Sequence, residues 1–199
     1  MTMPHIDFWY EFASTYSYPA AMRMEDAAKA RGVEVRWRPF LLGPIFFDQG
    51  WRNSPFNIYP AKGRYMWRDV ERICEGLGLP FARPEPFPQN SLMAARLALA
   101  LEDAQRPAFT RAVYAAQFGE RRQIAEKETL AAILAGLGLD PEPHFARAAS
   151  EAVKTRLKEE TDEAKRLGIF GAPAFIAGEE LFWGSDRLDP ALDWAAKRG

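Results

Sequence analysis

Strand-forming sequence occurs only towards the two ends of this 199-residue chain, and a long helical stretch lies between them. Residues 6–12 (IDFWYEF) are short, aromatic and β-branched, which is typical of a buried strand, and residues 33–40 alternate apolar and charged side chains. Between these two segments, residues 18–31 are mostly helix formers, and Gly32 follows where a helix would end. Because a helix connects them, we expect the two strands to be parallel and the crossover to be right-handed.

Strand character returns in the C-terminal part of the chain. Residues 174–177 and 181–183 flank a turn at Gly178-Glu179, which predicts a β-hairpin. Residues 188–197 then favour a closing helix.

The predicted order of elements is therefore β-α-β, a helical block, and then β-β-α. A thioredoxin core has this order without the block. We predict an α/β fold with a thioredoxin-like core formed by residues 1–62 and 168–199. Residues 63–167 are predicted to form an inserted α-helical domain.

Residues 41–62 predict a long loop, because glycine, proline and asparagine recur through them. A long ordered loop in a compact protein is usually functional. Its aromatic residues argue against disorder. Together with Phe87, some of them are candidates for an apolar pocket that takes an aromatic substrate, or for packing between the helices and the sheet. These candidates are Phe46, Phe47 and Trp51.

The composition excludes several classes of function. A formal net charge of −1 gives no basic excess for nucleic acid, and no apolar run is long enough to span a membrane. The single cysteine, Cys74, excludes an internal disulfide, a CxxC redox pair and a thiolate zinc site. His5 and His144 have no ligand-like neighbours, so we predict no metal site. The short polar segment before Ile6 does not resemble a signal peptide, so we expect a cytoplasmic protein.

Ser14 lies between the first predicted strand and the first predicted helix. The unpaired amides and the dipole of a helix N-terminus favour negative charge there, and a thiolate at that point would have a lowered pKa. Redox proteins with this fold carry their nucleophilic cysteine in this turn, whereas this chain has serine. The thiolate would therefore have to come from outside the chain. The alternative is that Ser14 only caps the helix.

Two segments near the C-terminus are further candidates for a ligand site. In a thioredoxin core, the proline equivalent to Pro173 is cis, and the backbone of the preceding residue, here Ala172, pairs with a peptide-like ligand such as glutathione. The alternative is that Pro173 only marks the start of a strand. Ser185 and Asp186 stand at a helix start, where Asp186 is suited to an α-ammonium group, although both are also ordinary capping residues.

Asn53 and Lys62 flank the aromatic segment. An anionic tripeptide needs a cation, and Lys62 is placed to supply one, although a surface lysine is usually only solvated. Lys62 would thus supply the positive charge for such a ligand.

Four segments resemble, in family order, motifs of 2-hydroxychromene-2-carboxylate isomerases and of kappa-class glutathione transferases. The first segment, FWYEFASTYSY, is similar to a strand followed by Ser-Pro-Tyr-Ser. NSPFNIYPAKGRY resembles the glutathione-binding loop, GIFGAPAFI the cis-proline segment, and FWGSDRL the γ-glutamyl site. The motifs span residues 8–188. The resemblance implies a DsbA-like thioredoxin fold in the kappa-class arrangement.

The same resemblance implies roles for individual residues. Ser14 becomes the catalytic serine that holds the glutathione sulfur. Thr15 departs from the family, which usually has proline there, and this makes the turn less rigid. The residues implied to bind glutathione are Asn53, Lys62, Ala172, Trp183, Gly184, Ser185 and Asp186. The residues implied to contact the aromatic substrate are Ile45, Phe46 and Phe87.

The implied activity is a glutathione-dependent cis-trans isomerisation of 2-hydroxychromene-2-carboxylate, or of a close aromatic analogue, by reversible thiolate addition. A small aromatic carboxylate is then the substrate, and the family likeness implies a homodimer. Two alternatives remain open. One is a kappa-class-like transferase that conjugates glutathione to small electrophiles, and the other is a non-catalytic module that binds glutathione or peptides.

Overall fold

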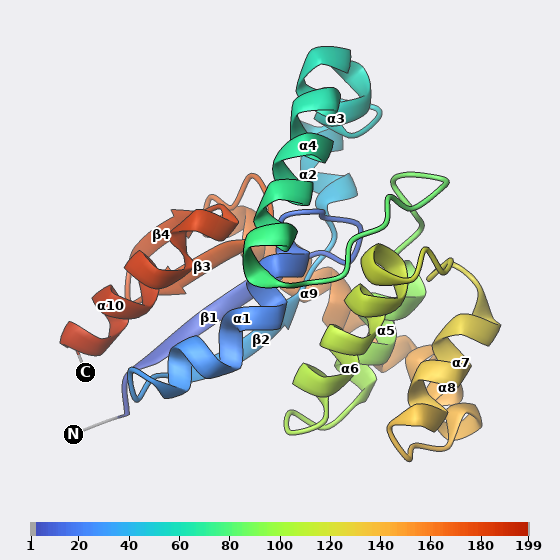
Figure 1. Ribbon diagram of the computed structural model, residues 1–199. Coiled ribbons are helices and arrows are strands. Elements are labelled where there is room, and N and C mark those ends of the chain that lie inside the picture. Colours follow the sequence, from blue (N-terminus) through green and yellow to red (C-terminus); the bar gives the residue numbers. More distant parts are fainter. Residues whose placement is uncertain (1–2, 199) are drawn as a thin grey trace.

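The structure is a computed structural model that describes residues 3–198, and its centre is a four-stranded sheet in the order β2-β1-β3-β4 (Figure 1). β1 (His5–Tyr10) is parallel to β2 (Glu34–Pro39). β3 (Ala174–Ala177) is antiparallel both to β1 and to β4 (Glu180–Trp183), so the two ends of the chain share one sheet. The predicted thioredoxin-like core, with β-α-β at one end of the chain and β-β-α at the other, is confirmed.

Two helices cover one face of the sheet. α1 (Ser17–Lys29) connects β1 to β2, and α10 (Leu188–Arg198) follows β4. Both helices contribute buried side chains to the main hydrophobic core, where they meet Phe8 and Tyr10 of β1. Figure 1 shows the start of β1 and the end of α10, which are next to the two termini, at the same end of this sheet.

The opposite face of the sheet has a second, smaller core. Side chains alternate between the faces of a strand, so Trp9 points away from its neighbours Phe8 and Tyr10. Trp9 packs with residues of α2 (Leu42–Asp48) and with Ala164 of α9 (Glu151–Arg166). The sheet is therefore a middle layer between two layers of helices.

The chain between β2 and β3 is helical, and in Figure 1 helices α5–α8 lie together beyond the end of the sheet that is opposite the termini. None of the helices in residues 3–198 is both long and apolar enough to cross a membrane. The remaining helices of this stretch are α3 (Pro55–Ile58), α4 (Pro60–Leu77), α5 (Leu92–Ala100), α6 (Arg106–Tyr114), the π-helix η1 (Ala115–Gly119), α7 (Lys127–Gly136) and α8 (Pro141–Ala148).

The prediction of a long loop over residues 41–62 is wrong. Helices α2 and α3 and the start of α4 occupy most of it. Pro55 and Pro60 each stand in the first turn of a helix, a position that proline favours because its missing N–H would be unpaired there. The proposed domain boundary between residues 62 and 63 lies inside α4, and the division into domains stays a prediction.

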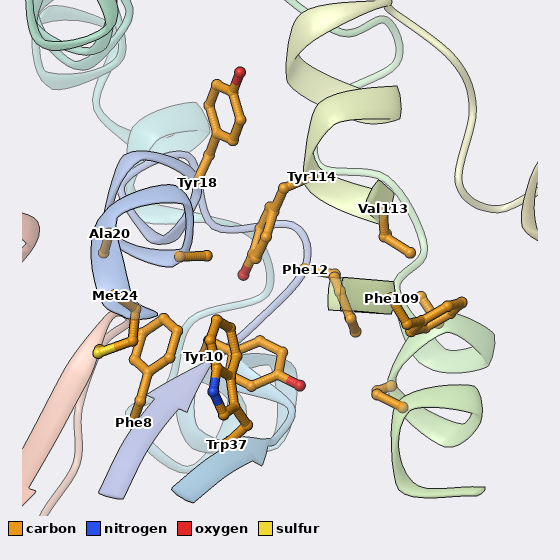
Figure 2. Close-up of a cluster of buried hydrophobic side chains, with 14 of the residues drawn as sticks. Phe8, Tyr10, Phe12, Tyr18, Ala20, Met24, Trp37, Phe109, Val113 and Tyr114 are labelled. Atoms are coloured by element: carbon orange, nitrogen blue, oxygen red, sulfur yellow. The ribbon is translucent and has the colours of Figure 1, made fainter. Parts of the chain in front are cut away.

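Aromatic side chains connect the sheet to the helical stretch (Figure 2). Phe12, just after β1, lies 5.4 Å from Tyr114 and 6.3 Å from Phe109 between ring centroids, and both partners belong to α6. The Tyr114 hydroxyl also donates a hydrogen bond to the backbone carbonyl of Glu11 at 2.8 Å. The turn that follows β1 is thereby anchored to a helix about a hundred residues further along the chain.

Candidate active site

A cavity of about 1200 Å³ opens beside the turn that follows β1. Its walls also come from the α2–α4 segment, from the residues just before α5, and from the chain on either side of β3 and β4. All the predicted site residues except Ile45 line this cavity. They are Ser14, Phe46, Asn53, Lys62, Phe87, Ala172, Trp183, Gly184, Ser185 and Asp186.

Ile45 is not brought to the cavity. Its side chain is 5% exposed and packs in the second core with Trp9 and Phe40. Successive residues of a helix point in directions about 100° apart, so Ile45 faces the sheet while Phe46 faces the cavity. The prediction for Ile45 came from the family resemblance, which does not show which face of α2 a residue occupies.

Ser14 connects the start of α1 to the segment that precedes β3. Its backbone N–H donates to the Glu11 carbonyl at 2.9 Å, which closes a turn. Its Oγ donates to the carbonyl oxygen of Ala172 at 2.8 Å and accepts from the N–H of Ser17, the first residue of α1, at 3.3 Å. The Ala172–Pro173 peptide bond is cis. The hydroxyl thus contacts the helix start, as a cap would, and also lines the cavity.

The N-terminus of α1 favours an anion at this point. The helix has 13 residues, and its first turn carries no acidic side chain. The positive end of the helix dipole therefore faces the region of Ser14. The first two N–H groups of the helix already have acceptors, since Ser17 donates to Ser14 Oγ and Tyr18 to the Thr15 carbonyl, each at 3.3 Å. A thiolate or carboxylate placed there would be stabilised.

The α2–α4 wall carries two basic side chains. Lys62 lies with its Nζ 5.0 Å from the centroid of the Tyr59 ring, and Arg52 lies with its guanidinium 4.4 Å from the Phe47 ring. Neither forms an ion pair within residues 3–198. Asn53 holds this segment together, since its Oδ1 accepts from the N–H of Ser54 at 2.7 Å.

The opposite wall follows β4. The N–H of Gly184 donates to the Pro173 carbonyl at 3.0 Å, and Gly184 has φ of 109°, a conformation that favours glycine. The 3₁₀ helix η2 (Ser185–Arg187) begins at the next residue and carries Asp186, whose carboxylate lies 3.1 Å from Arg187. Trp183 contacts Phe170 in a tilted arrangement, with 4.9 Å between ring centroids.

The aromatic side chains form the apolar part of the cavity. Phe46 lies 5.5 Å from Trp51, and Phe87 lies 4.7 Å from Trp67, between ring centroids. Phe46, Trp51 and Phe87 line the cavity, and Trp67 supports Phe87 from α4.

Several polar residues of the cavity were not predicted from the sequence, among them Glu11, Tyr16, Asp69 and Ser91. Tyr16 donates from its hydroxyl to Asp69 of α4 at 3.0 Å. Glu11 is 6% exposed, and its carboxylate accepts from the N–H of Ala13 at 2.8 Å and from the hydroxyl of Ser91. Burial raises the pKa of Glu11 to about 7, against the opposite effect of these two hydrogen bonds. Glu11 alone gave a signal in the sequence, as a second acidic residue within an otherwise apolar and aromatic strand segment.

The fold and the site together define a class, namely thioredoxin-like proteins in which serine occupies the turn before the first helix. The family model of the DSBA-like thioredoxin domain matches residues 5–193, and the chain belongs to this family.

Comparison with known proteins shows which members of this family the chain resembles. The chain is 28% identical over 184 residues to a 2-hydroxychromene-2-carboxylate isomerase of Sphingobium xenophagum, covering 92% of this chain and 94% of the relative. It is 27% identical over 204 residues to glutathione S-transferase kappa 1 of Homo sapiens, covering 92% and 87%. A solved structure of a 2-hydroxychromene-2-carboxylate isomerase matches with a TM-score of 0.87 at 27% identity, over 98% of this chain and 95% of that one. The resemblance seen in the sequence is confirmed, and these relatives are isomerases and transferases.

Proposed function

We propose that this protein is a glutathione-dependent isomerase that converts 2-hydroxychromene-2-carboxylate, or a close aromatic analogue, to its trans ring-opened form. One observation carries the proposal: the Ser14 hydroxyl lies in the cavity at the start of α1, in a turn that has no cysteine. Cys74 is buried in α4, and burial raises the pKa of its thiol to about 11. The reactive thiol must therefore arrive with a ligand.

The polar groups of the cavity fit glutathione, which carries two carboxylates, an ammonium group and a thiol. Asp186 would hold the ammonium of the γ-glutamyl end, and Lys62 with Asn53 would face a carboxylate. The Ala172 backbone would pair with the cysteinyl part as an added strand does. Other residues that would bound the γ-glutamyl end are Trp183, Gly184 and Ser185. When bound, glutathione supplies a thiolate that adds reversibly to the conjugated double bond and so permits rotation.

Ser14 and the helix N-terminus would keep the sulfur ionised. The Ser14 hydroxyl can turn from the Ala172 carbonyl and donate to the sulfur instead. A hydrogen bond to a charged group contributes about 1.5–3 kcal/mol, or about one to two pKa units. Such a shift brings a thiol from a pKa near 8.5 to near neutral pH, and the dipole of α1 acts in the same direction.

The aromatic wall supports a planar second substrate. Phe46, Trp51 and Phe87 line the cavity, and its volume of about 1200 Å³ is somewhat above the usual range of about 300–1,000 Å³ for small-molecule sites. The cavity therefore has room for a tripeptide and a bicyclic carboxylate together.

Replacing Ser14 with alanine tests the proposal. We expect Ser14→Ala to bind glutathione with little change while the isomerase kcat falls roughly 10- to 100-fold, because the lost hydrogen bond stabilises only the charged sulfur. Calorimetry and a spectrophotometric isomerase assay measure the two quantities. Ser150→Ala makes the same change at the remote cap of α9 and should leave kcat unaltered. A wild-type kcat in Ser14→Ala would remove the proposed role.

The kappa-class relatives support a second candidate, a transferase that conjugates glutathione to small electrophiles. It would use the same glutathione-binding residues. An assay with chlorodinitrobenzene beside one with the hydroxychromene carboxylate separates the two activities. Failure of the wild-type protein to bind glutathione in calorimetry would instead favour a non-catalytic peptide-binding module.

A further inference from the structure

Glu11 is a buried acidic residue that the proposed mechanism does not use, although it lines the cavity and precedes Ser14 by three residues. Its backbone carbonyl accepts from the N–H of Ser14 at 2.9 Å and from the Tyr114 hydroxyl at 2.8 Å. Its carboxylate accepts from the N–H of Ala13 at 2.8 Å and from the hydroxyl of Ser91. One residue thus ties the Ser14 turn to α6 and to the start of α5.

The partner of the carboxylate on α5 is itself buried. Ser91 is 7% exposed and immediately precedes the first residue of α5. Both residues line the cavity, so the hydrogen bond between them joins two of its walls. Loss of this contact would free the turn that carries Ser14.

The charge of Glu11 is not neutralised by any basic side chain within residues 3–198, since no ion pair reaches it there. A buried carboxylate without a cation favours its protonated form. Burial raises the pKa of Glu11 to about 7, so the group changes charge near neutral pH.

We propose that Glu11 is a positioning residue for the Ser14 turn. We also propose that a negative charge on its carboxyl group opposes ionisation of a thiol bound beside Ser14. The inference rests on the proposed function, because the thiol is that of glutathione. The ends of a four-residue turn lie within about 7 Å of each other between Cα atoms. Two negative charges at roughly 10 Å in a partly buried site repel each other enough to move a pKa by about one unit.

Other titratable groups lie near Glu11 and the proposed thiol position, and these groups are the same in every variant compared below. Burial holds the pKa of Tyr114 well above its ordinary value, and the nearby Glu11 charge acts in the same direction, so this phenol stays neutral. The remaining groups beside Glu11 or on the cavity wall are Tyr10, Tyr16, Arg52, Lys62, Asp69 and Asp186.

Glu11→Gln removes the charge and keeps the contacts. The glutamine Oε1 can accept from the N–H of Ala13, and its Nε2 can donate to Ser91. The readout is the ultraviolet absorbance of the glutathione thiolate, titrated against pH with saturating protein. We expect the thiol pKa to be about one unit lower in Glu11→Gln than in the wild type, with a single sharper transition.

Glu75→Gln is the matched control, because it removes an exposed acidic charge from α4 outside the cavity. It should leave the thiol pKa unchanged. A second variant, Ser91→Ala, keeps the acid but removes its partner, and it should lower kcat more than it changes KM because the Ser14 turn is loosened.

The outcomes separate the two proposals. If glutathione binds the wild type and Glu11→Gln with the same thiol pKa, the role of Glu11 is overturned and the proposed function stays intact. Wild-type protein that binds no glutathione would overturn the proposed function and this inference with it. A thiol pKa that is lower in Glu11→Gln than in the wild type, and unchanged in Glu75→Gln, would support the inference.

Discussion

The hydroxyl of Ser14 and the carboxyl of Glu11 belong to one short turn, yet their surroundings give them opposite properties. Ser14 lies at a helix N-terminus that favours negative charge. Glu11 lies behind the same turn, in a buried setting that disfavours it. Under the proposed function, the site would stabilise an anion on the ligand and disfavour a second anion on the protein.

The buried carboxyl has a consequence for stability. Below about pH 4.5 Glu11 is protonated in the folded and unfolded protein alike. As pH rises towards 7 the unfolded chain releases its proton first, because its pKa is the ordinary 4.5 while the folded pKa is about 7. The folded protein therefore loses stability through this window, by up to about 3 kcal/mol at 1.36 kcal/mol per unit.

Glu11→Gln should remove this loss. We expect the free energy of unfolding of the variant, relative to the wild type, to rise by up to about 3 kcal/mol between about pH 4.5 and about pH 8. Urea titrations at a series of pH values measure it without any ligand. A difference that stays constant over this range would show that Glu11 ionises normally.

At the level of elements, the α3–α4 corner positions two polar residues that line the cavity from one side. Asn53 precedes α3, and Lys62 stands in the first turn of α4. Gly63 lets the two helices approach, because a Cβ at this residue would overlap the carbonyl oxygen of Phe56 in α3. Glycine in a helix interior is otherwise unfavourable, so its presence here is explained by this contact.

Gly63→Ala should therefore displace α3 and weaken glutathione binding. We expect a loss of about 1–3 kcal/mol in stability, as for an overpacked contact, together with a higher Kd in calorimetry. Gly76→Ala is a matched control in the same helix, since a Cβ there would meet no atom within 4 Å. That variant should gain up to about 1 kcal/mol from helix propensity and bind normally. Equal effects of the two substitutions would contradict the packing argument.

For the whole molecule, one main core runs without a break from the sheet into the helical stretch. This core contains Phe8 of β1, Phe12 just after β1, and Phe109 of α6. The Tyr10 hydroxyl adds a 2.9 Å hydrogen bond to Thr110 of α6. A shared core of this kind couples the unfolding of its parts.

We accordingly expect residues 63–167 to unfold together with the sheet in a single transition. Far-ultraviolet circular dichroism follows the helices, and near-ultraviolet signals follow the aromatic cluster of Figure 2. The two melting curves should coincide. Two separate transitions would instead show that the helical stretch is an independently stable domain.

The order of elements and most of the site followed from the sequence. Short-range patterns determine where strands and helices form. Three of the four motifs contain Ser14, Asn53 with Lys62, and Asp186, respectively. The pattern does not predict α2 and α3, because proline in the first turn of a helix, here Pro44 and Pro55, is also a typical loop residue.

Only the tertiary structure decided which side chains meet across the cavity. Glu11 and Ser91 are 80 residues apart, and Tyr16 and Asp69 are 53 apart, so no local pattern predicts either contact. Ile45 likewise points into the second core only because α2 packs against the sheet. Burial, which changes the ionisation of Glu11, exists only once these distant segments pack together.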